Sequence, residues 1–469
     1  MKTEIVNKVF GKVMGVLPFY FFTFLPLSAQ TYTLQQLTDS ALQHNIAMRS
    51  AQHDIEAAQQ QRREAFTKFF PTVSGTALTF NANRGMAKMD IDPSSMIPSS
   101  MAASLSQLLP AEALVALSSP ISMSMMKNGS IASLMAMQPV FAGGQIVNGN
   151  KLARVGEEAS RLQLSLKQNE VERQVAEYYW QLVSLDEKQR TLDAVKALLD
   201  DLYKDVEVAV RAGVALRNDL LQVQLRQNDV ESQQLKLKNG QEVLRMITAQ
   251  YCGLAPTPAP SSAGGEVGYS FQVIAPKMDT PGILVSPPAR EGAGVGLLPE
   301  YQLLEKQVEA TRLQKKMAVG QNLPTVAVGA GYNYHNLLDN DRTFAMAFAT
   351  VSIPISDWWG GSHAIKRRKI AVLQAEEQLQ DNAQLLTIRM QKAANDVEEA
   401  RQQLLLARRG IEQAEENLRL NRDRYRAGTC TMSDLLEAQL LHQQAQDKCT
   451  DAYADLQLRL LDYRQATGQ

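Results

Sequence analysis

The chain has 469 residues with 48 basic and 49 acidic side chains, so its formal net charge is −1 at pH 7. This balance excludes the basic surface that nucleic-acid binding requires. Three cysteines exclude a disulfide framework. The five histidines are scattered without the spacing of a metal site, and no motif of an enzyme active site occurs. The sequence therefore predicts no enzyme, no cofactor and no bound metal.

The first 29 residues have the pattern of an export signal. Lysines precede the apolar run VMGVLPFYFFTFLPL, and the small residues Ser28 and Ala29 follow it. The run contains Pro18 and Pro26 and is shorter than the roughly 20 residues that a helical membrane span needs. We therefore predict a Sec-type signal peptide over residues 1–29 rather than a membrane anchor, and no transmembrane helix after it.

Residues 30–255 are expected to form a helix, a β-hairpin, a very long helix and a returning helix. The strands of the hairpin are PTVSGTALTF and IASLMAMQPVF. The Met-, Ser- and Pro-rich insertion between them, about residues 86–120, is expected to be a long external loop. The proline-free stretch from about Ile146 to Arg211 predicts one helix of about 100 Å at 1.5 Å per residue.

A Pro-, Gly- and Ser-rich connector is expected over residues 256–297, with short structure left open around Tyr269 to Ile274. Residues 298–469 repeat the order of the first half. The second long helix is expected from about His363 to Arg426, directly after the pair Gly360-Gly361.

The second hairpin is predicted from the strands PTVAVGAGYNY and TFAMAFATVSIPI, joined by the polar turn LLDNDR. In the first strand one face carries Val326, Val328, Ala330, Tyr332 and Tyr334. In the second, Phe344, Met346 and Phe348 stand opposite alanines. We expect one bulky apolar face with tyrosines near one end and one face of small residues. This pattern is typical of transmembrane β-barrels, although a soluble sheet is the alternative.

The turn after each long helix has nearly the same sequence, RAGVALRNDLLQVQ and YRAGTCTMSDLLEAQ. Gly213 and Gly428 lie 215 positions apart and suit left-handed helix ends. Asn218 or Ser433 is expected to cap the returning helix, with an aspartate in its first turn.

Four strands per chain cannot close a membrane barrel, because the smallest bacterial barrels have eight strands and an open edge in lipid is prohibitive. Several chains must therefore combine, and three chains would supply twelve strands. The long helices leave the same end of both hairpins and would project together as the wall of a tube. Geometry alone does not choose between a dimer and a trimer.

This order of elements resembles the TolC-like outer-membrane efflux proteins over essentially the whole mature chain. The similar segments are LTDSALQHN, LPEYQLLEKQVEATRLQKKMAVGQNLPTV, RAGVALRNDLLQVQ and YRAGTCTMSDLLEAQL. The resemblance implies a mainly α fold with a β portion: a homotrimeric, twelve-stranded outer-membrane barrel continuous with a long periplasmic α-helical barrel. It also implies outer-membrane lipid, a periplasmic adaptor and an inner-membrane pump as partners. Ile46 departs from the family, which often has proline there.

The resemblance implies that the helices converge at the two turns, where acidic side chains narrow the pore. The gate candidates are Tyr425, Asp434, Glu437, Asp219 and Asn218. The alternative role of both aspartates is to stabilise helix N-termini. The family can carry a basic gate residue at the position of Cys430, so an ion pair with such a residue is not expected here.

The same turns are the expected adaptor-docking tip. Its candidates are Arg211, Gly213, Leu220, Leu221, Arg426, Gly428, Leu435 and Leu436. The alternative is that the glycines only permit the turn and the leucines only pack between helices. Trp358 and Trp359 lie at a strand–helix boundary, and either membrane-interface anchoring or burial below the barrel accounts for them.

The function expected on this basis is the exit duct of a tripartite efflux system in a Gram-negative bacterium, which passively conducts small molecules across the outer membrane. One alternative is the duct of a type I protein-secretion system. A second, of another class, is a soluble periplasmic coiled-coil adaptor.

Overall fold

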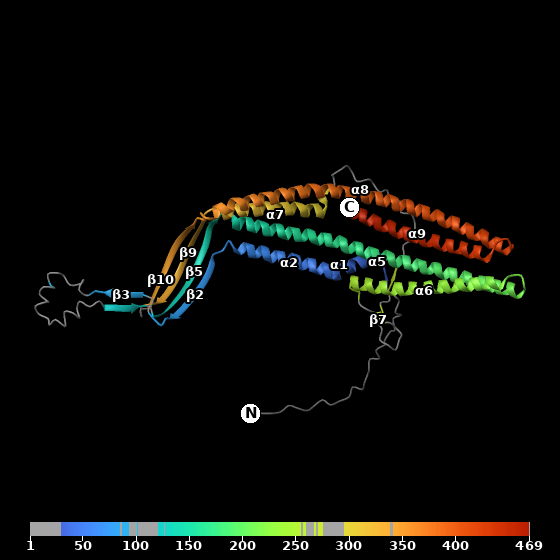
Figure 1. The fold of residues 1–469 in the computed structure, drawn as a ribbon, viewed down its shortest axis with the longest axis horizontal. Coiled ribbons are helices and arrows are strands. Elements are labelled where there is room, and N and C mark those ends of the chain that lie inside the picture. The colour runs from blue at the N-terminus through green and yellow to red at the C-terminus, as the bar shows by residue number, and fades with distance from the viewer. Residues whose placement is uncertain are drawn as a thin grey trace, which may run out of the picture.

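The computed structural model describes residues 30–84, 87–92, 101, 121–125, 127–254, 257–258, 267–268, 271–274, 295–337 and 341–468. The predicted signal peptide and most of the insertion and of the connector lie outside the described residues. The molecule is strongly elongated, with a curved sheet at one end from which long helices run away together (Figure 1). The four chain segments that leave this sheet all continue as helices on the same side of it.

The N-terminal segment forms β1 (Gln30–Tyr32), α1 (Leu34–His44) and α2 (Ile46–Thr67). Asn45 ends α1 and caps α2, since its Oδ1 accepts from the N–H of Ala47 at 2.8 Å. Ile46 is thus the first residue of a capped helix. Proline is common at this position, but the helix does not require it there. Pro299 holds the same position in α7 (Pro299–Gln321). The departure at Ile46 therefore leaves the local fold intact.

The sheet contains β2 (Thr72–Asn81), β5 (Asn128–Ala142), β9 (Thr325–Asn336) and β10 (Asp341–Ser352). Its order is β10-β9-β5-β2, and all neighbours are antiparallel. The four predicted strands are confirmed. The insertion is not a loop throughout, because β3 (Ala87–Ile91) pairs with β4 (Ile121–Met125) and so forms a two-stranded ribbon at its two ends.

The expected division into a bulky and a small face is wrong for the second hairpin. Pairing sets even-numbered residues of β9 opposite odd-numbered residues of β10, as in Tyr332 with Ala345. Phe348 therefore shares a face with Gly329, and not with Val328. The pairing register of the two strands decides which residues share a face, and the alternation within each single strand does not show that register.

The register defines two faces across the whole sheet. The valine–alanine face carries Val73, Leu134, Ala136, Val328, Ala330, Tyr332, Ala345, Ala347, Ala349 and Val351, and towards the strand ends the polar residues Thr79, Ser130, Gln138 and Thr343. The mixed face carries Thr72, Ser74, Thr76, Ser133, Met135, Met137, Gly329, Gly331, Asn333, Phe344, Met346 and Phe348, together with Leu78, Phe80 and Ile131. Each face thus combines residues from both hairpins.

The two long helices are α5 (Gln145–Arg211), with 67 residues, and α8 (Asp357–Arg426), with 70 residues. Each is about 100 Å long at 1.5 Å per residue, as predicted. Gly360 and Gly361 lie inside the first turns of α8 and do not precede it, because the helix begins soon after Pro354. The returning helices α6 (Arg217–Cys252) and α9 (Met432–Thr467) have 36 residues each. No described helix is both long and apolar enough to cross a bilayer.

The connector forms a short pair, β6 (Thr257–Pro258) with β7 (Val267–Gly268), and the strand β8 (Phe271–Val273). Within the stretch where short structure was left open, Phe271–Val273 is a strand, which pairs in parallel with β1. The rings of Tyr32 and Phe271 meet edge to face, with centroids 5.8 Å apart. The 3-10 turn η2 (Val295–Leu297) then leads into α7.

The largest buried cluster lies beside α1, between the sheet and the turns and away from both (Figure 1). It joins α1, α5, α8 and α9 through residues such as Leu37, Val175, Leu404 and Leu456. The rings of Trp180 and Tyr453 pack edge to face within it, with centroids 5.7 Å apart. This cluster holds both helical hairpins together and so fixes the direction in which their turns project.

Candidate functional site at the two helical turns

The two turns lie at the end of the molecule farthest from the sheet (Figure 1). Gly213 has φ +77° and Gly428 has φ +68°, which is left-handed backbone that favours glycine. The N–H of Gly428 donates to the carbonyl of Tyr425 at 2.9 Å, and that of Thr429 to the carbonyl of Arg424 at 2.9 Å. These bonds satisfy the last carbonyls of α8, as the sequence predicted for both glycines.

The caps of the returning helices are not the predicted residues. Leu216 precedes α6 and Thr431 precedes α9, whereas Asn218 and Ser433 each lie at the second helical position. The reason lies with Asp219 and Asp434, which are third-position residues that reach back to the N–H of the cap. The predicted role of both aspartates at helix N-termini is confirmed.

The second turn closes this contact in both directions. Asp434 Oδ2 accepts from the N–H of Thr431 at 2.9 Å and from its hydroxyl at 2.8 Å, and the N–H of Asp434 donates to Thr431 Oγ1 at 3.2 Å. The bonds from the backbone and side chain of Thr431 hold the pKa of Asp434 below its usual value. In the first turn, Asp219 accepts from the N–H of Leu216 at 3.3 Å, but a leucine side chain has no oxygen to return the bond.

Tyr425 connects the gate candidates of the two turns. It packs half-buried against the cluster of Val206, Val223, Met432 and Leu435. Burial raises the pKa of its hydroxyl, and the negative charge of Asp219 raises it further. Tyr425 of the second turn and Asp219 of the first are thus neighbours within one chain.

The remaining gate candidates point to solvent in the single chain. Asn218, Asp434 and Glu437 are exposed. Asp434 and Glu437 lie three positions apart on α9 and hence on the same side of that helix. Cys430 is half-buried, and its Sγ donates to the carbonyl of Asn421 at 3.4 Å. The two carboxylates thus form an acidic surface, and Cys430 supplies it with no cation.

The docking candidates divide into buried and exposed residues. Leu435 is only 4% exposed in the cluster beneath Tyr425, and Leu220 and Leu436 pack partly buried against that cluster. Arg211 is exposed and donates to Glu207 at 2.8 Å, and Arg426 is also exposed. Leu221 is 47% exposed. Of the four leucines, Leu221 therefore offers the largest apolar surface to a partner.

The sequence reasoning missed two larger apolar side chains in the first turn. Val214 is 80% exposed and Leu216 is 70% exposed. The signal was present in RAGVALRN, because a tight turn between two helices has no core in which to bury such residues. At the equivalent places the second turn carries Thr429 and Thr431.

A second missed residue is Arg226, which joins the returning helices. It donates through Nε to Gln439 Oε1 at 3.2 Å and through Nη2 to Gln443 Oε1 at 2.8 Å. Both glutamines are buried, and burial lowers the pKa of Arg226. Ser433 also donates to Gln222 at 3.3 Å. These polar contacts hold the first and second turns against one another.

At the other end of the helices, the pair Trp358-Trp359 begins α8 beside the sheet. Trp358 Nε1 donates to the carbonyl of Asn322 at 2.9 Å, and Trp359 is 81% exposed. In the single chain these rings are therefore not buried below the sheet. Anchoring at a membrane interface stays a prediction for this pair.

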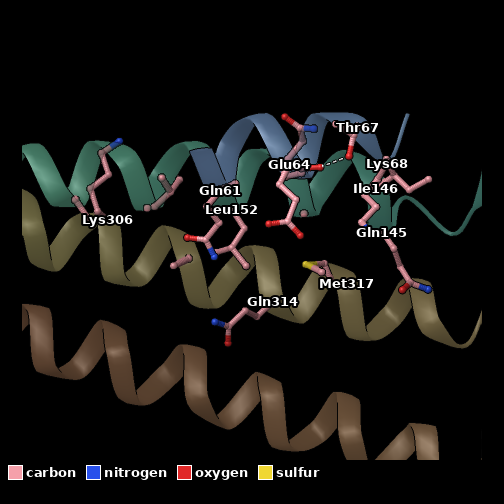
Figure 2. Close-up of a pocket in the computed structure, with 18 of the residues that line it drawn as sticks. Gln61, Glu64, Thr67, Lys68, Gln145, Ile146, Leu152, Lys306, Gln314 and Met317 are labelled. Atoms are coloured by element: carbon pink, nitrogen blue, oxygen red, sulfur yellow. Dashed lines mark hydrogen bonds between the residues drawn. The ribbon is translucent and has the colours of Figure 1, made fainter. Parts of the chain in front are cut away.

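A groove of about 1380 Å³ lies between α2, α5 and α7, close to the sheet. Figure 2 shows side chains such as Glu64, Lys306 and Gln314 from the flanking helices around it. Two adjacent carboxylates of α5 form ion pairs with the helices on either side of the groove. Glu157 pairs with Arg62 of α2 at 3.0 Å, and Glu158 pairs with Lys306 of α7 at 2.7 Å. The pairs fasten the three helices into one layer.

Comparison with proteins of known structure identifies the fold. VceC of Vibrio cholerae has a TM-score of 0.67 at 16% identity, over 93% of this chain and 96% of that chain. CmeC of Campylobacter jejuni has a TM-score of 0.71 at 15% identity, over 93% and 85%. MtrE of Neisseria gonorrhoeae, solved in an open state, has a TM-score of 0.68 at 16% identity, over 93% and 88%. All three are described as outer membrane proteins or channels.

Comparison with curated proteins gives no match. The family described as outer membrane efflux protein matches residues 37–243 and 299–469. These two segments cover most of both halves of the chain, including both long helices and both turns. The chain belongs to the outer membrane efflux protein family.

Proposed function

We propose that the protein is the exit duct of a tripartite efflux system, which passively conducts small molecules across the outer membrane. One observation carries the proposal: the four-stranded sheet has β10 and β2 at its edges, and helices of about 100 Å leave it on one side. Edges of this kind are prohibitive in lipid unless other chains pair with them. Three copies would close a barrel of twelve strands, and their helices would form the tube in the periplasm.

The proposed export route begins with residues 1–29 as a signal peptide. Residues 30–255 and 298–469 then form two structural repeats, with 256–297 as the connector. In the assembled trimer, Asp434 and Glu437 would form acidic rings at the narrow end, with Tyr425, Asp219 and Asn218 beside them. Rings of carboxylates favour cations. The gate would open when the two helical hairpins of each chain separate.

The proposed partners are a periplasmic adaptor and an inner-membrane pump. The exposed apolar residues Val214, Leu216 and Leu221 support a docking surface on the first turn, because solvent-exposed apolar clusters mark interaction sites. Arg211, Gly213, Arg426 and Gly428 would shape the rim of this surface. The buried Leu435 would support it from within.

Membrane fractionation and gel migration before and after heating test the assembly. We expect the protein in the outer membrane as a heat-sensitive trimer, and a soluble monomer would refute the proposal. A deletion strain then tests the cargo. Intracellular accumulation of dyes or bile salts supports small-molecule export, whereas loss of one secreted protein with unchanged dye accumulation would indicate a protein-secretion duct.

A further inference from the structure

Large apolar side chains form a band on the mixed face of the sheet, among its hydroxyl groups. Met135 and Met137 of β5 lie in register with Gly331 and Gly329 of β9. The same glycines lie in register with Met346 and Phe348 of β10. We call Met135, Met137, Phe344, Met346 and Phe348 the Met–Phe band.

The two glycines let the band close over β9. A Cβ atom at Gly329 would lie 2.5 Å from Cζ of Phe348, and one at Gly331 would lie 3.3 Å from Cγ of Met135. The ring of Phe348 and the side chain of Met135 therefore occupy the space above the backbone of β9 from its two sides. As a result, the band is continuous across three strands rather than split into two rows.

The chemistry of the two faces decides which of them meets lipid. In the two rows through Ala136 and Leu134, the valine–alanine face has only apolar side chains and the ring of Tyr332. Its polar residues Gln138, Thr79 and Ser130 lie in rows nearer to the two ends of the strands. The mixed face carries hydroxyl and amide groups, among them Thr76 and Ser133, whose side-chain oxygens are 2.6 Å apart. Barrels in a membrane place their apolar face outward and their polar residues inward. In the proposed trimer the mixed face, and with it the Met–Phe band, would line the interior.

We propose that the Met–Phe band contacts the solute inside the barrel and favours amphiphilic molecules with an aromatic body over hydrated ions. The proposal rests on the duct function proposed above. Thioether chains adapt to irregular apolar shapes, and they and aromatic rings both attract aromatic surfaces. Phe344 and Met346 are 46% and 40% exposed, so their surfaces are available to such a solute.

The orientation of the sheet is tested with neighbouring residues that point to opposite faces. Phe348→Cys and Ala347→Cys are each assembled in lipid vesicles and treated with a membrane-impermeant thiol reagent, with the unsubstituted chain as the blank for the native cysteines. We expect labelling at position 348 and little at 347. Labelling at 347 without labelling at 348 would place the band against lipid and overturn the proposal.

The contact itself is tested by block of the potassium current through single channels in planar bilayers, with ethidium as the aromatic cation and tetraethylammonium as the aliphatic control. The double variant Met346→Ser/Phe348→Ser should raise the half-blocking concentration of ethidium about three- to tenfold, the loss expected for an apolar contact. The block by tetraethylammonium should stay the same. Val351→Ser makes a similar change on the valine–alanine face and should leave both unchanged.

The outcomes distinguish failure of this inference from failure of the proposed duct function. A conducting channel whose ethidium block is unchanged in the double variant would refute the band and leave the duct standing. An equal loss of block by both cations would also refute it, because the band then distinguishes no aromatic body. A protein that carries no current before substitution would refute the duct, and the band with it.

Discussion

The two turns of this chain share a backbone and differ in surface. Both use a left-handed glycine after the long helix and an aspartate at the third position of the returning helix. In the second turn, Thr431 and Asp434 form reciprocal hydrogen bonds that satisfy N–H groups at the start of α9. The large apolar residues of this turn are buried. The first turn has Leu216 at that cap and exposes Val214. The comparison supports the proposal that the first turn docks a partner and that the second forms the gate.

The largest effect is expected where the second turn is buried. Leu435→Ala should lower the free energy of unfolding by about 2–5 kcal/mol, the usual cost of a buried leucine. Leu220→Ala, at the equivalent place in the first turn, should lower it by less, because that side chain is only partly buried. Thermal unfolding and the rate of proteolysis at the turns measure both. Equal losses of unfolding free energy in the two variants would contradict the difference between the turns.

A smaller effect is expected on export through the first turn. Leu216→Asp places a charge in the proposed docking surface and should lower dye export about tenfold, equivalent to about 1.4 kcal/mol of lost binding. The control change Thr429→Asp, at the place in the second turn that corresponds to Val214, should leave export close to normal. Trimer assembly is checked by gel migration for both. Normal export by an assembled Leu216→Asp trimer would exclude docking at this position.

Substitutions at the two caps are expected to change helix stability in opposite directions. Thr431→Ala removes a hydroxyl that accepts from the N–H of Asp434, at a cost of about 1 kcal/mol. Leu216→Ser supplies the missing hydroxyl and should stabilise the start of α6 by a similar or smaller amount. Hydrogen exchange of the amides at the N-terminal ends of α6 and α9 measures each effect at its own helix. Faster exchange in α6 after Leu216→Ser would contradict the reciprocal contact as the cause.

The smallest effect is a pH dependence of the second turn. The pKa of Asp434 is lowered in the folded chain by Thr431, so its stabilising contribution is present above the usual carboxyl value of 3.8. That contribution is lost as the pH falls through the lowered folded value. Asp434→Asn should therefore be less heat-stable than the unsubstituted protein at pH 7, with the difference shrinking towards pH 3. A difference that is constant with pH would assign the effect to packing.

Sequence periodicity was enough to predict the strands, the long helices and the glycine turns, because each depends on local residues. The cap Thr431 was also readable, because it lies three residues before Asp434 in the spacing of a capping box, and the expected cap Ser433 is wrong. The faces of the sheet were not readable. They depend on the pairing of β9 with β10, which sets Phe348 beside Gly329 rather than Val328.

The candidate site was predictable in its location but not in its exposure. Leu221 and Leu436 hold the same place in nearly identical segments, but Leu221 is half exposed whereas Leu436 packs partly buried against the cluster of Val206 and Leu435. The difference arises from which side of each returning helix meets its neighbours, and this is a property of the tertiary packing. Arg226 was missed for the same reason, because its glutamine partners are more than 200 positions away.

The position of the buried cluster around Trp180 makes each long helix a lever. From Trp180 to the end of α5 at Arg211 the helix extends about 46 Å at 1.5 Å per residue. A tilt of about 5° at the cluster would then move the turn by about 4 Å, more than the length of a hydrogen bond such as those of Arg226. Small rearrangements among the packed aromatic rings would thus be amplified into displacements large enough to part the two turns.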